Sequence, residues 1–216
     1  MSTASIDTMT GWRSATRAVF IVLAGVCLAT LGWYGGADAD DAHSAIVIDS
    51  GPLKGTNVDG VREYLGIPYA APPVGSLRWM PPQSFGKWKG LLQATQFGSE
   101  CPQPSGGNEN CLFLNVYAPA DAEKNDSKKG GGRAVMVWIH GGGMTEGGAD
   151  LYDPSPLVQA GGVVVVTINY RLGILGFFAH PAIDVEGHLA GNYGINSSRW
   201  VGYSEISPRS AATRSR

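Results

Sequence analysis

The chain has 216 residues, of which 44% are hydrophobic and 16% are charged, and its formal net charge is −2. This composition is ordinary for a globular protein and is enough for one domain of moderate size. A nucleic-acid-binding protein usually carries a basic stripe, so the nearly neutral charge argues against a nucleic-acid partner. The 31 glycines and 13 prolines predict many tight turns and long loops.

The first 39 residues have the pattern of a secretory signal peptide. Arg13 and Arg17 precede an uncharged run at 18–34, and Ala37–Ala39 (Ala-Asp-Ala) offers a cleavage site. We therefore expect a secreted or periplasmic protein. The alternative is an uncleaved membrane anchor formed by residues 18–34, and only then would the membrane be a partner. That run is slightly shorter than the ~20 residues of a spanning helix, which favours cleavage.

Export would give the cysteines an oxidising environment. Cys27 lies in the apolar run and would leave with it, whereas Cys101 and Cys111 remain as a closely spaced pair. A disulfide between them would close a short loop and contribute roughly 2–3 kcal/mol through loop entropy. The alternative is two reduced, buried thiols.

The next part of the chain alternates short apolar stretches with turn residues. Residues 69–90 carry several prolines, which predict an ordered loop pinned by Trp79, Phe85 and Trp88. The polar, glycine-ended segment 120–133 predicts an exposed loop. The predicted strands of this part are 45–49, 61–67 and 111–119.

The two strongest strand patterns follow. Residues 134–140 (AVMVWIH) and 163–170 (VVVVTINY) are nearly continuous apolar runs rich in β-branched residues. Such runs are typical of strands buried on both faces, in a sheet covered by helices. The segment between them can hold a loop and a short helix around 156–160. Strand, loop, helix and strand form one crossover unit, so we expect an α/β fold.

The motif that carries chemistry is His140-Gly141-Gly142-Gly143, directly after the first of these strands. Three glycines leave backbone N–H groups unshielded and permit unusual dihedral angles. Such a loop can direct two N–H donors at the oxyanion of an acyl-transfer intermediate, where each donor typically contributes ~10²–10³ in rate. The alternative is a glycine-rich turn without a ligand. Neither common phosphate-binding glycine motif is present.

Several further stretches favour the oxyanion-binding loop over a glycine-rich turn without a ligand. The sequence resembles the type-B carboxylesterase family in six pieces that follow one another in family order: YLGIPYAAPPVGSLRW, CPQ, ENCLFLNVYAP, VMVWIHGGG, VVVVTINYRLGILGFF and GNYGI. The resemblance implies the N-terminal part of an α/β-hydrolase sheet with helices on both faces, incomplete here and covering residues 40–195. It also implies hydrolysis of small-molecule carboxylic esters through an acyl-serine intermediate. We expect no cofactor and no metal ion.

The resemblance assigns roles to individual residues. The N–H groups of Gly142 and Gly143 would stabilise the oxyanion, Cys101 and Cys111 would form the first disulfide, and His140 would be structural. Two positions depart from the family pattern. Asn110 stands where Asp is usual, which would weaken a local polar network. Met144 stands where an aromatic residue is usual, which would alter a pocket wall.

The catalytic triad is missing from these 216 residues. The family order is Ser, Glu or Asp, then His, with the Ser in G-x-S-x-G. The sequence contains no such motif, and the nearest stretch, 202–206 (GYSEI), lacks the second glycine. His43, His180 and His188 all precede that stretch and are ordinary loop or surface residues in our interpretation. We therefore expect the chain as printed to be inactive.

The tail 196–216 is rich in Ser and Arg and has no apolar periodicity. Permitted codons for 196–213 and the first two bases of the Arg214 codon, read from the third base of the Asn196 codon, can encode QFALGWVQRNIAAFGGDP, which resembles the family's continuation. Our hypothesis is that a deletion, splice variant or sequencing error shifts the frame after Ile195. A genuine evolved tail is the alternative.

Loss of the nucleophile segment has a structural consequence. In the family sheet, the strand leading to the nucleophile lies beside residues 134–140, so here that strand would become an exposed apolar edge. The preferred function is an ester hydrolase truncated before its nucleophile. The alternative is a non-catalytic, cholinesterase-like adhesion protein, which has no physical need for an intact His-Gly-Gly-Gly loop.

Overall fold

The computed structural model describes residues 45–121, 132–181 and 191–198. The predicted signal peptide, the 202–206 stretch and most of the 120–133 loop and the tail lie outside these residues. Within them, no helix is both long and apolar enough to cross a bilayer.

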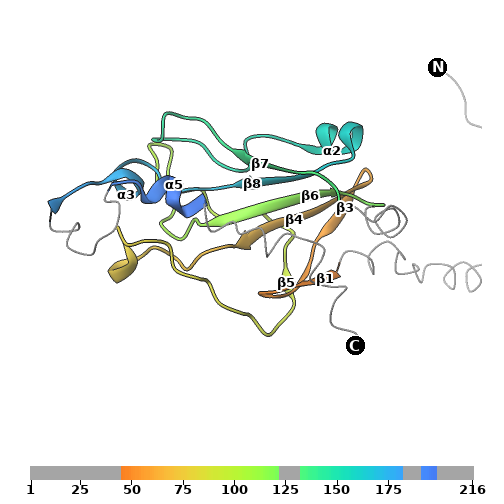
Figure 1. The fold of residues 1–216 in the computed structure, drawn as a ribbon, viewed down its shortest axis with the longest axis horizontal. Coiled ribbons are helices and arrows are strands. Elements are labelled where there is room, and N and C mark those ends of the chain that lie inside the picture. Colours follow the sequence, from red (N-terminus) through yellow and green to blue (C-terminus); the bar gives the residue numbers. More distant parts are fainter. Residues whose placement is uncertain (1–44, 122–131, 182–190, 199–216) are drawn as a thin grey trace, which may run out of the picture. The chain divides into compact units, whose positions relative to one another are not determined.

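The described residues form two sheets (Figure 1). The larger has the order β3-β4-β6-β8-β7, with antiparallel pairs except for the parallel pair β7 and β8. The smaller has the order β1-β2-β5. The strands are β1 (Ala45–Ile48), β2 (Gly51–Lys54), β3 (Thr56–Val58), β4 (Val61–Pro68), β5 (Leu92–Gln93), β6 (Phe113–Pro119), β7 (Val135–Ile139) and β8 (Val164–Ile168). All five strands predicted from the sequence are present.

Short helices follow or connect the strands. They are η2 (Gly75–Leu77), α2 (Ser155–Gly161), α3 (Gly173–Phe177) and α5 (Tyr193–Ser198). The predicted helix around 156–160 is confirmed as α2, which begins with a proline in its first turn and ends at Gly162 in the left-handed conformation, φ 61°. Val158 of α2 is fully buried against Val61 and Val165, so α2 covers one face of the larger sheet.

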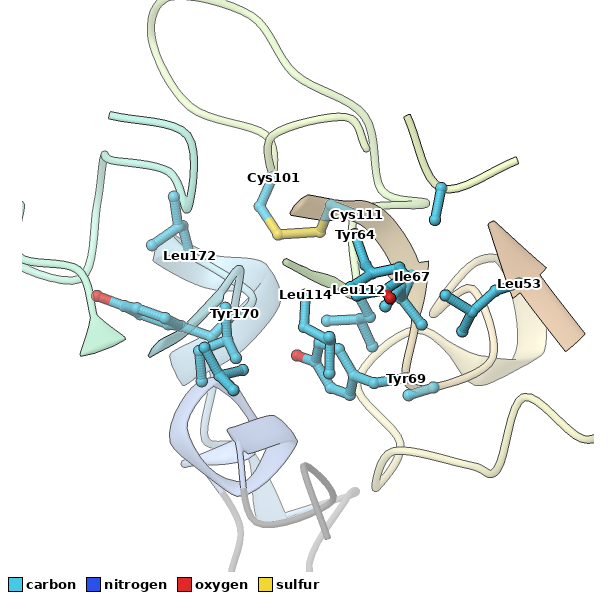
Figure 2. Packing of buried hydrophobic residues seen from close by; sticks show 14 residues of the cluster. Leu53, Tyr64, Ile67, Tyr69, Cys101, Cys111, Leu112, Leu114, Tyr170 and Leu172 are labelled. Carbon is cyan, nitrogen blue, oxygen red and sulfur yellow. A yellow bond between two sulfur atoms is a disulfide. The ribbon is translucent and has the colours of Figure 1, made fainter. Parts of the chain in front are cut away.

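The other face of the larger sheet carries the main core. Leu114 of β6 and Ile168 of β8 belong to this core together with Tyr69 and Leu112. Figure 2 shows Leu114, Tyr69 and Leu112 gathered near the disulfide. Burial of such side chains is the main favourable contribution to folding, about 1.5–3 kcal/mol for each large aliphatic residue.

A polar residue is built into the sheet at a β-bulge. The register of β4 against β6 shifts between Tyr64 and Ile67. The freed N–H of Gly66 donates to the side-chain oxygen of Asn115 at 2.9 Å, and the Asn115 amide donates to Thr167 at 2.9 Å. Gly66 has φ 69°, which favours glycine. The buried amide is therefore satisfied at both ends, as a buried polar group must be.

The predicted ordered loop at 69–90 is also present. Trp88 donates from its ring N–H to the Pro52 carbonyl at 2.7 Å, and Trp79 donates to the Ile174 carbonyl at 3.0 Å. Phe85 meets Trp88 edge-on, with ring centroids 6.3 Å apart. These contacts hold a proline-rich segment that contains no regular structure except the short helix η2.

The strands β7 and β8 differ sharply in burial. All of β8 after Val164 is buried, as predicted, whereas every residue of β7 is exposed. The prediction that 134–140 is buried on both faces is therefore wrong for this chain. The reason is that β7 is the last strand of its sheet and no described element covers its outer side. The expectation of an exposed apolar edge is correct: Val137 is 47% and Ile139 is 51% accessible.

An apolar edge without charge or proline is a template for pairing with another chain. We expect Val137→Lys to weaken self-association of the 216-residue chain. Pairing of this edge with another chain would bury Val137, which contributes about 1.5–3 kcal/mol, whereas it would cost free energy to bury a charged lysine there. A rise of about tenfold in the dissociation constant is the expected size. Sedimentation across a concentration series would measure it. Ile174→Lys, at an exposed residue of α3, is the control, and an equal effect there would contradict the assignment to β7.

Candidate active site

The glycine loop, residues 140–147, begins where β7 ends. The chain leaves the carboxyl end of a parallel strand, and this is where α/β sheets generally bind ligands. Residues 141–143 are exposed, whereas His140 directly before them is buried. The loop therefore has a fixed base and an accessible tip.

The tip is a tight turn that closes on Gly142. The N–H groups of Thr145 and Glu146 both donate to the Gly142 carbonyl, at 3.1 and 3.2 Å. Gly142 has φ 113° and Gly143 has φ 62°, and a side chain at Gly142 would overlap the Glu146 carbonyl. Only glycine fits this position, because the dihedral angle and the close approach both exclude a Cβ.

The N–H groups of Gly142 and Gly143 are not used within the described part of the chain. Among the described residues, none accepts a hydrogen bond from the N–H of Gly142 or of Gly143, and both residues are exposed. A single oxygen atom can accept hydrogen bonds from two adjacent N–H groups at an exposed tip. Two N–H donors directed at one point can stabilise negative charge developing on an acyl oxygen.

His140 is held in the base of the loop by three contacts. Its backbone carbonyl accepts from the Tyr170 hydroxyl at 2.9 Å, and its ring stacks on Tyr170 with centroids 4.3 Å apart. Its Nδ1 lies 2.8 Å from the Gly141 carbonyl. A carbonyl only accepts hydrogen bonds, so Nδ1 carries the proton. Burial lowers the pKa of His140 below its usual 6.5, and the ring is neutral at neutral pH.

The remaining ring nitrogen faces no partner. The Nε2 atom of His140 is buried, and no residue in the described part of the chain forms a hydrogen bond with it. His140 is only 3% exposed, whereas Gly142 and Gly143 are exposed residues. Its place in the loop base accords with a structural role.

Met144 introduces a strain that the sequence did not reveal. It adopts a left-handed conformation with φ 65°, which costs a residue with a side chain roughly 1–2 kcal/mol. Its carbonyl accepts from the Gly173 N–H at 2.7 Å, and its side chain is half exposed beside the glycine tip. The departure at Asn110 lies elsewhere, on an exposed turn where its N–H bonds to Asn108 at 2.8 Å.

The segment closed by the disulfide also contacts the glycine loop. Cys101 and Cys111 are joined in the structure and both are buried. Gln103 within that closed loop bonds to both backbone groups of Gly147. Sequence reasoning missed Gln103 and Tyr170 as partners of the loop. Their only signals were a place in the CPQ piece and at the end of an apolar run.

Of the other residues considered from the sequence, only His180 is described by the structure. His180 stacks on Phe178 with ring centroids 6.0 Å apart. His43, His188 and Ser204 lie outside the described residues. Within the described ranges, no three His, Cys, Asp or Glu side chains converge as metal ligands would.

Comparison with known proteins places this geometry in a family. Residues 42–197 match the model of the carboxylesterase family. This chain belongs to the carboxylesterase family. It is 42% identical over 172 residues to the fumonisin B1 esterase of Sphingopyxis macrogoltabida, a match covering 74% of this chain and 30% of that protein. Neuroligin-3 of Mus musculus is 34% identical over 196 residues, covering 69% and 23%.

Solved carboxylesterase structures confirm the predicted α/β-hydrolase fold. PNB esterase superposes with a TM-score of 0.67 at 40% identity, covering 76% of this chain and 35% of the other. The chain thus spans about a third or less of the length of the relatives it matches. It carries the part of the carboxylesterase fold that contains the glycine loop.

The lowered pKa of the buried His140 can be measured by titration. Because its pKa is lower in the folded chain, the unfolded chain binds more protons below pH 6.5. The contribution of His140 to stability is therefore present above pH 6.5 and is lost as the pH falls through the folded pKa. We expect NMR of the imidazole to show the Nδ1–H tautomer and a midpoint below 6.5. A midpoint at or above 6.5 would contradict the burial argument.

Proposed function

We propose that this chain is the oxyanion-binding portion of a carboxylic-ester hydrolase. The observation that carries the proposal is the pair of N–H groups of Gly142 and Gly143, two exposed residues whose N–H groups are bonded to no described residue. They follow β7, a strand of the fold that this chain shares with carboxylesterases. The fumonisin B1 esterase supports an ester as the substrate class.

The proposed reaction has two acyl-transfer steps. A serine oxygen attacks the ester carbonyl carbon, its proton passes to a histidine, and the carbonyl electron pair moves onto the oxygen. The oxyanion is stabilised by the N–H groups of Gly142 and Gly143 and by a third N–H beside the serine. The alcohol leaves with the proton, and water then releases the acyl group by the same route. No cofactor takes part in this scheme.

The 216 residues contain no G-x-S-x-G motif, so they lack the serine that this scheme requires. We therefore propose that they turn over no ester by themselves. The restored-frame enzyme is the protein encoded when the DNA beyond Ile195 is read in the alternative frame. It should contain the serine motif. Sequencing the coding DNA tests this directly, and an alternative frame without G-x-S-x-G would refute the frameshift hypothesis.

A non-catalytic binding protein is the second candidate, because neuroligin-3 is among the relatives. A protein that only binds needs no preformed pair of oxyanion donors. The intact glycine tip therefore favours the hydrolase. Absence of esterase activity in a restored-frame enzyme that contains the serine would favour the binding protein instead.

We also propose that the chain is exported and processed after Ala39. Intact-mass measurement of the protein secreted from a host cell should find a mature chain that begins at Asp40. Retention of residues 18–34 in a membrane fraction would support the anchor instead.

The oxyanion assignment predicts a specific kinetic loss. In the restored-frame enzyme, Gly142→Ala should lower kcat on a p-nitrophenyl ester by about 10²–10³, the usual cost of losing one oxyanion donor. The added methyl group would overlap the Glu146 carbonyl and displace the turn. Gly86→Ala is the matched control, since Gly86 has φ 87° but no atom within 4 Å of an added Cβ. Equal losses in both variants would attribute the effect to backbone strain alone.

A further inference from the structure

We infer that Gln103 is a positioning residue for the glycine loop, holding its donor N–H groups in place from the disulfide-closed loop. This inference rests on the proposed ester hydrolysis, because it assigns Gln103 a part in that reaction. Gln103 forms its hydrogen bonds to the glycine loop with Gly147, which it precedes by 44 residues in the sequence.

The contact between Gln103 and Gly147 uses both backbone groups of one residue. The Gly147 N–H donates to the Gln103 side-chain oxygen at 2.8 Å. The Gln103 amide donates back to the Gly147 carbonyl at 3.2 Å. A primary amide has one accepting and one donating end, so it can pair with a backbone unit as a neighbouring strand does. The same amide also donates to Glu100 at 2.9 Å, which fixes its orientation.

Gly147 passes this constraint to the base of the loop. It has φ 114°, and a side chain there would overlap Nδ1 of His140 and lie within 2.6 Å of the Gly141 carbonyl. The α-carbon of Gly147 therefore lies directly against the imidazole ring and the first glycine. Gly147 cannot shift toward them, and Gln103 prevents it from shifting away. The turn that closes on Gly142 is thus fixed at both ends.

Gln103 is itself firmly held. It belongs to the loop closed by the disulfide, whose two cysteines are fully buried. Its backbone N–H donates to the Gly106 carbonyl at 2.8 Å, and its carbonyl accepts from Gly106 at 2.9 Å. The disulfide loop is therefore a rigid support from which one side chain reaches the glycine loop.

A parallel contact ties the flanking segments together. The side chain of Asn169, at the end of β8, accepts from the Ala149 N–H at 2.8 Å and donates to the Ser99 carbonyl at 3.0 Å. Ala149 lies two residues after Gly147, and Ser99 lies two residues before Cys101. The segment around Ala149 and the segment around Ser99 thus lie beside each other. Of the side chains that join them, Gln103 is the one that bonds within the glycine loop.

The test uses residue-resolved amide hydrogen exchange on the 216-residue chain. The informative amides are those of Thr145 and Glu146, which donate to the Gly142 carbonyl and not to Gln103. Gln103→Leu should speed their exchange about tenfold, as expected when about 1.4 kcal/mol of local stability is lost. The Gly162 amide, which closes α2, should be unchanged.

Gln159→Leu is the matched control. Its side chain also donates to a backbone carbonyl, that of Asp59 at 2.9 Å, away from the glycine loop. It should leave the Thr145 and Glu146 amides unaffected. If Gln103→Leu does not fold, Gln103→Glu keeps the acceptor for Gly147 but loses the donor, and it should give a smaller rise. Unchanged exchange at Thr145 and Glu146, or an equal rise in Gln159→Leu, would overturn the inference.

A kinetic measurement separates this inference from the proposed function. In the restored-frame enzyme, Gln103→Leu should lower kcat on a p-nitrophenyl ester about tenfold with KM unchanged, because a displaced donor is lost mainly from the transition state. Absence of turnover in the unaltered enzyme would refute the proposed function. Normal turnover with an unchanged kcat in Gln103→Leu would refute only the role of Gln103.

Discussion

The turn that closes on the Gly142 carbonyl is the constraint on which the candidate site depends. Because Thr145 and Glu146 direct their N–H groups inward to that carbonyl, the N–H groups of Gly142 and Gly143 are left for a ligand. No other residue type fits at Gly142, since a side chain would overlap the Glu146 carbonyl. In the proposed reaction these two N–H groups would be in place before substrate binds, which is what makes oxyanion donors effective in catalysis.

The sheet supports this turn on one side only. The base of the loop is anchored by Tyr170, which follows the buried strand β8, and by Gln103 from the disulfide loop. The strand that carries the loop, β7, is exposed along its whole length. The chain thus combines a well-supported glycine loop with an uncovered apolar edge. The relatives, of which this chain covers about a third, share the fold of the part described.

Local sequence patterns predicted the strands and the glycine loop better than they predicted the contacts that these elements make with the rest of the chain. The apolar run before Tyr170 predicted β8 with its burial, and the His-Gly-Gly-Gly motif predicted an accessible loop after β7. The same kind of run predicted burial for β7, which failed because burial depends on a neighbour rather than on the strand itself. The left-handed Met144 and the pairing of Gln103 with Gly147 were not predictable, since they arise from contacts between distant segments.

The central claim is that the N–H groups of Gly142 and Gly143 bind the oxygen of a tetrahedral adduct. A crystal structure of the restored-frame enzyme with an aryl trifluoromethyl ketone bound to its serine would test it most directly. The account predicts that the adduct oxygen lies about 2.7–3.1 Å from both glycine nitrogens. An adduct whose oxygen points away from the glycine loop, toward solvent or other donors, would contradict it.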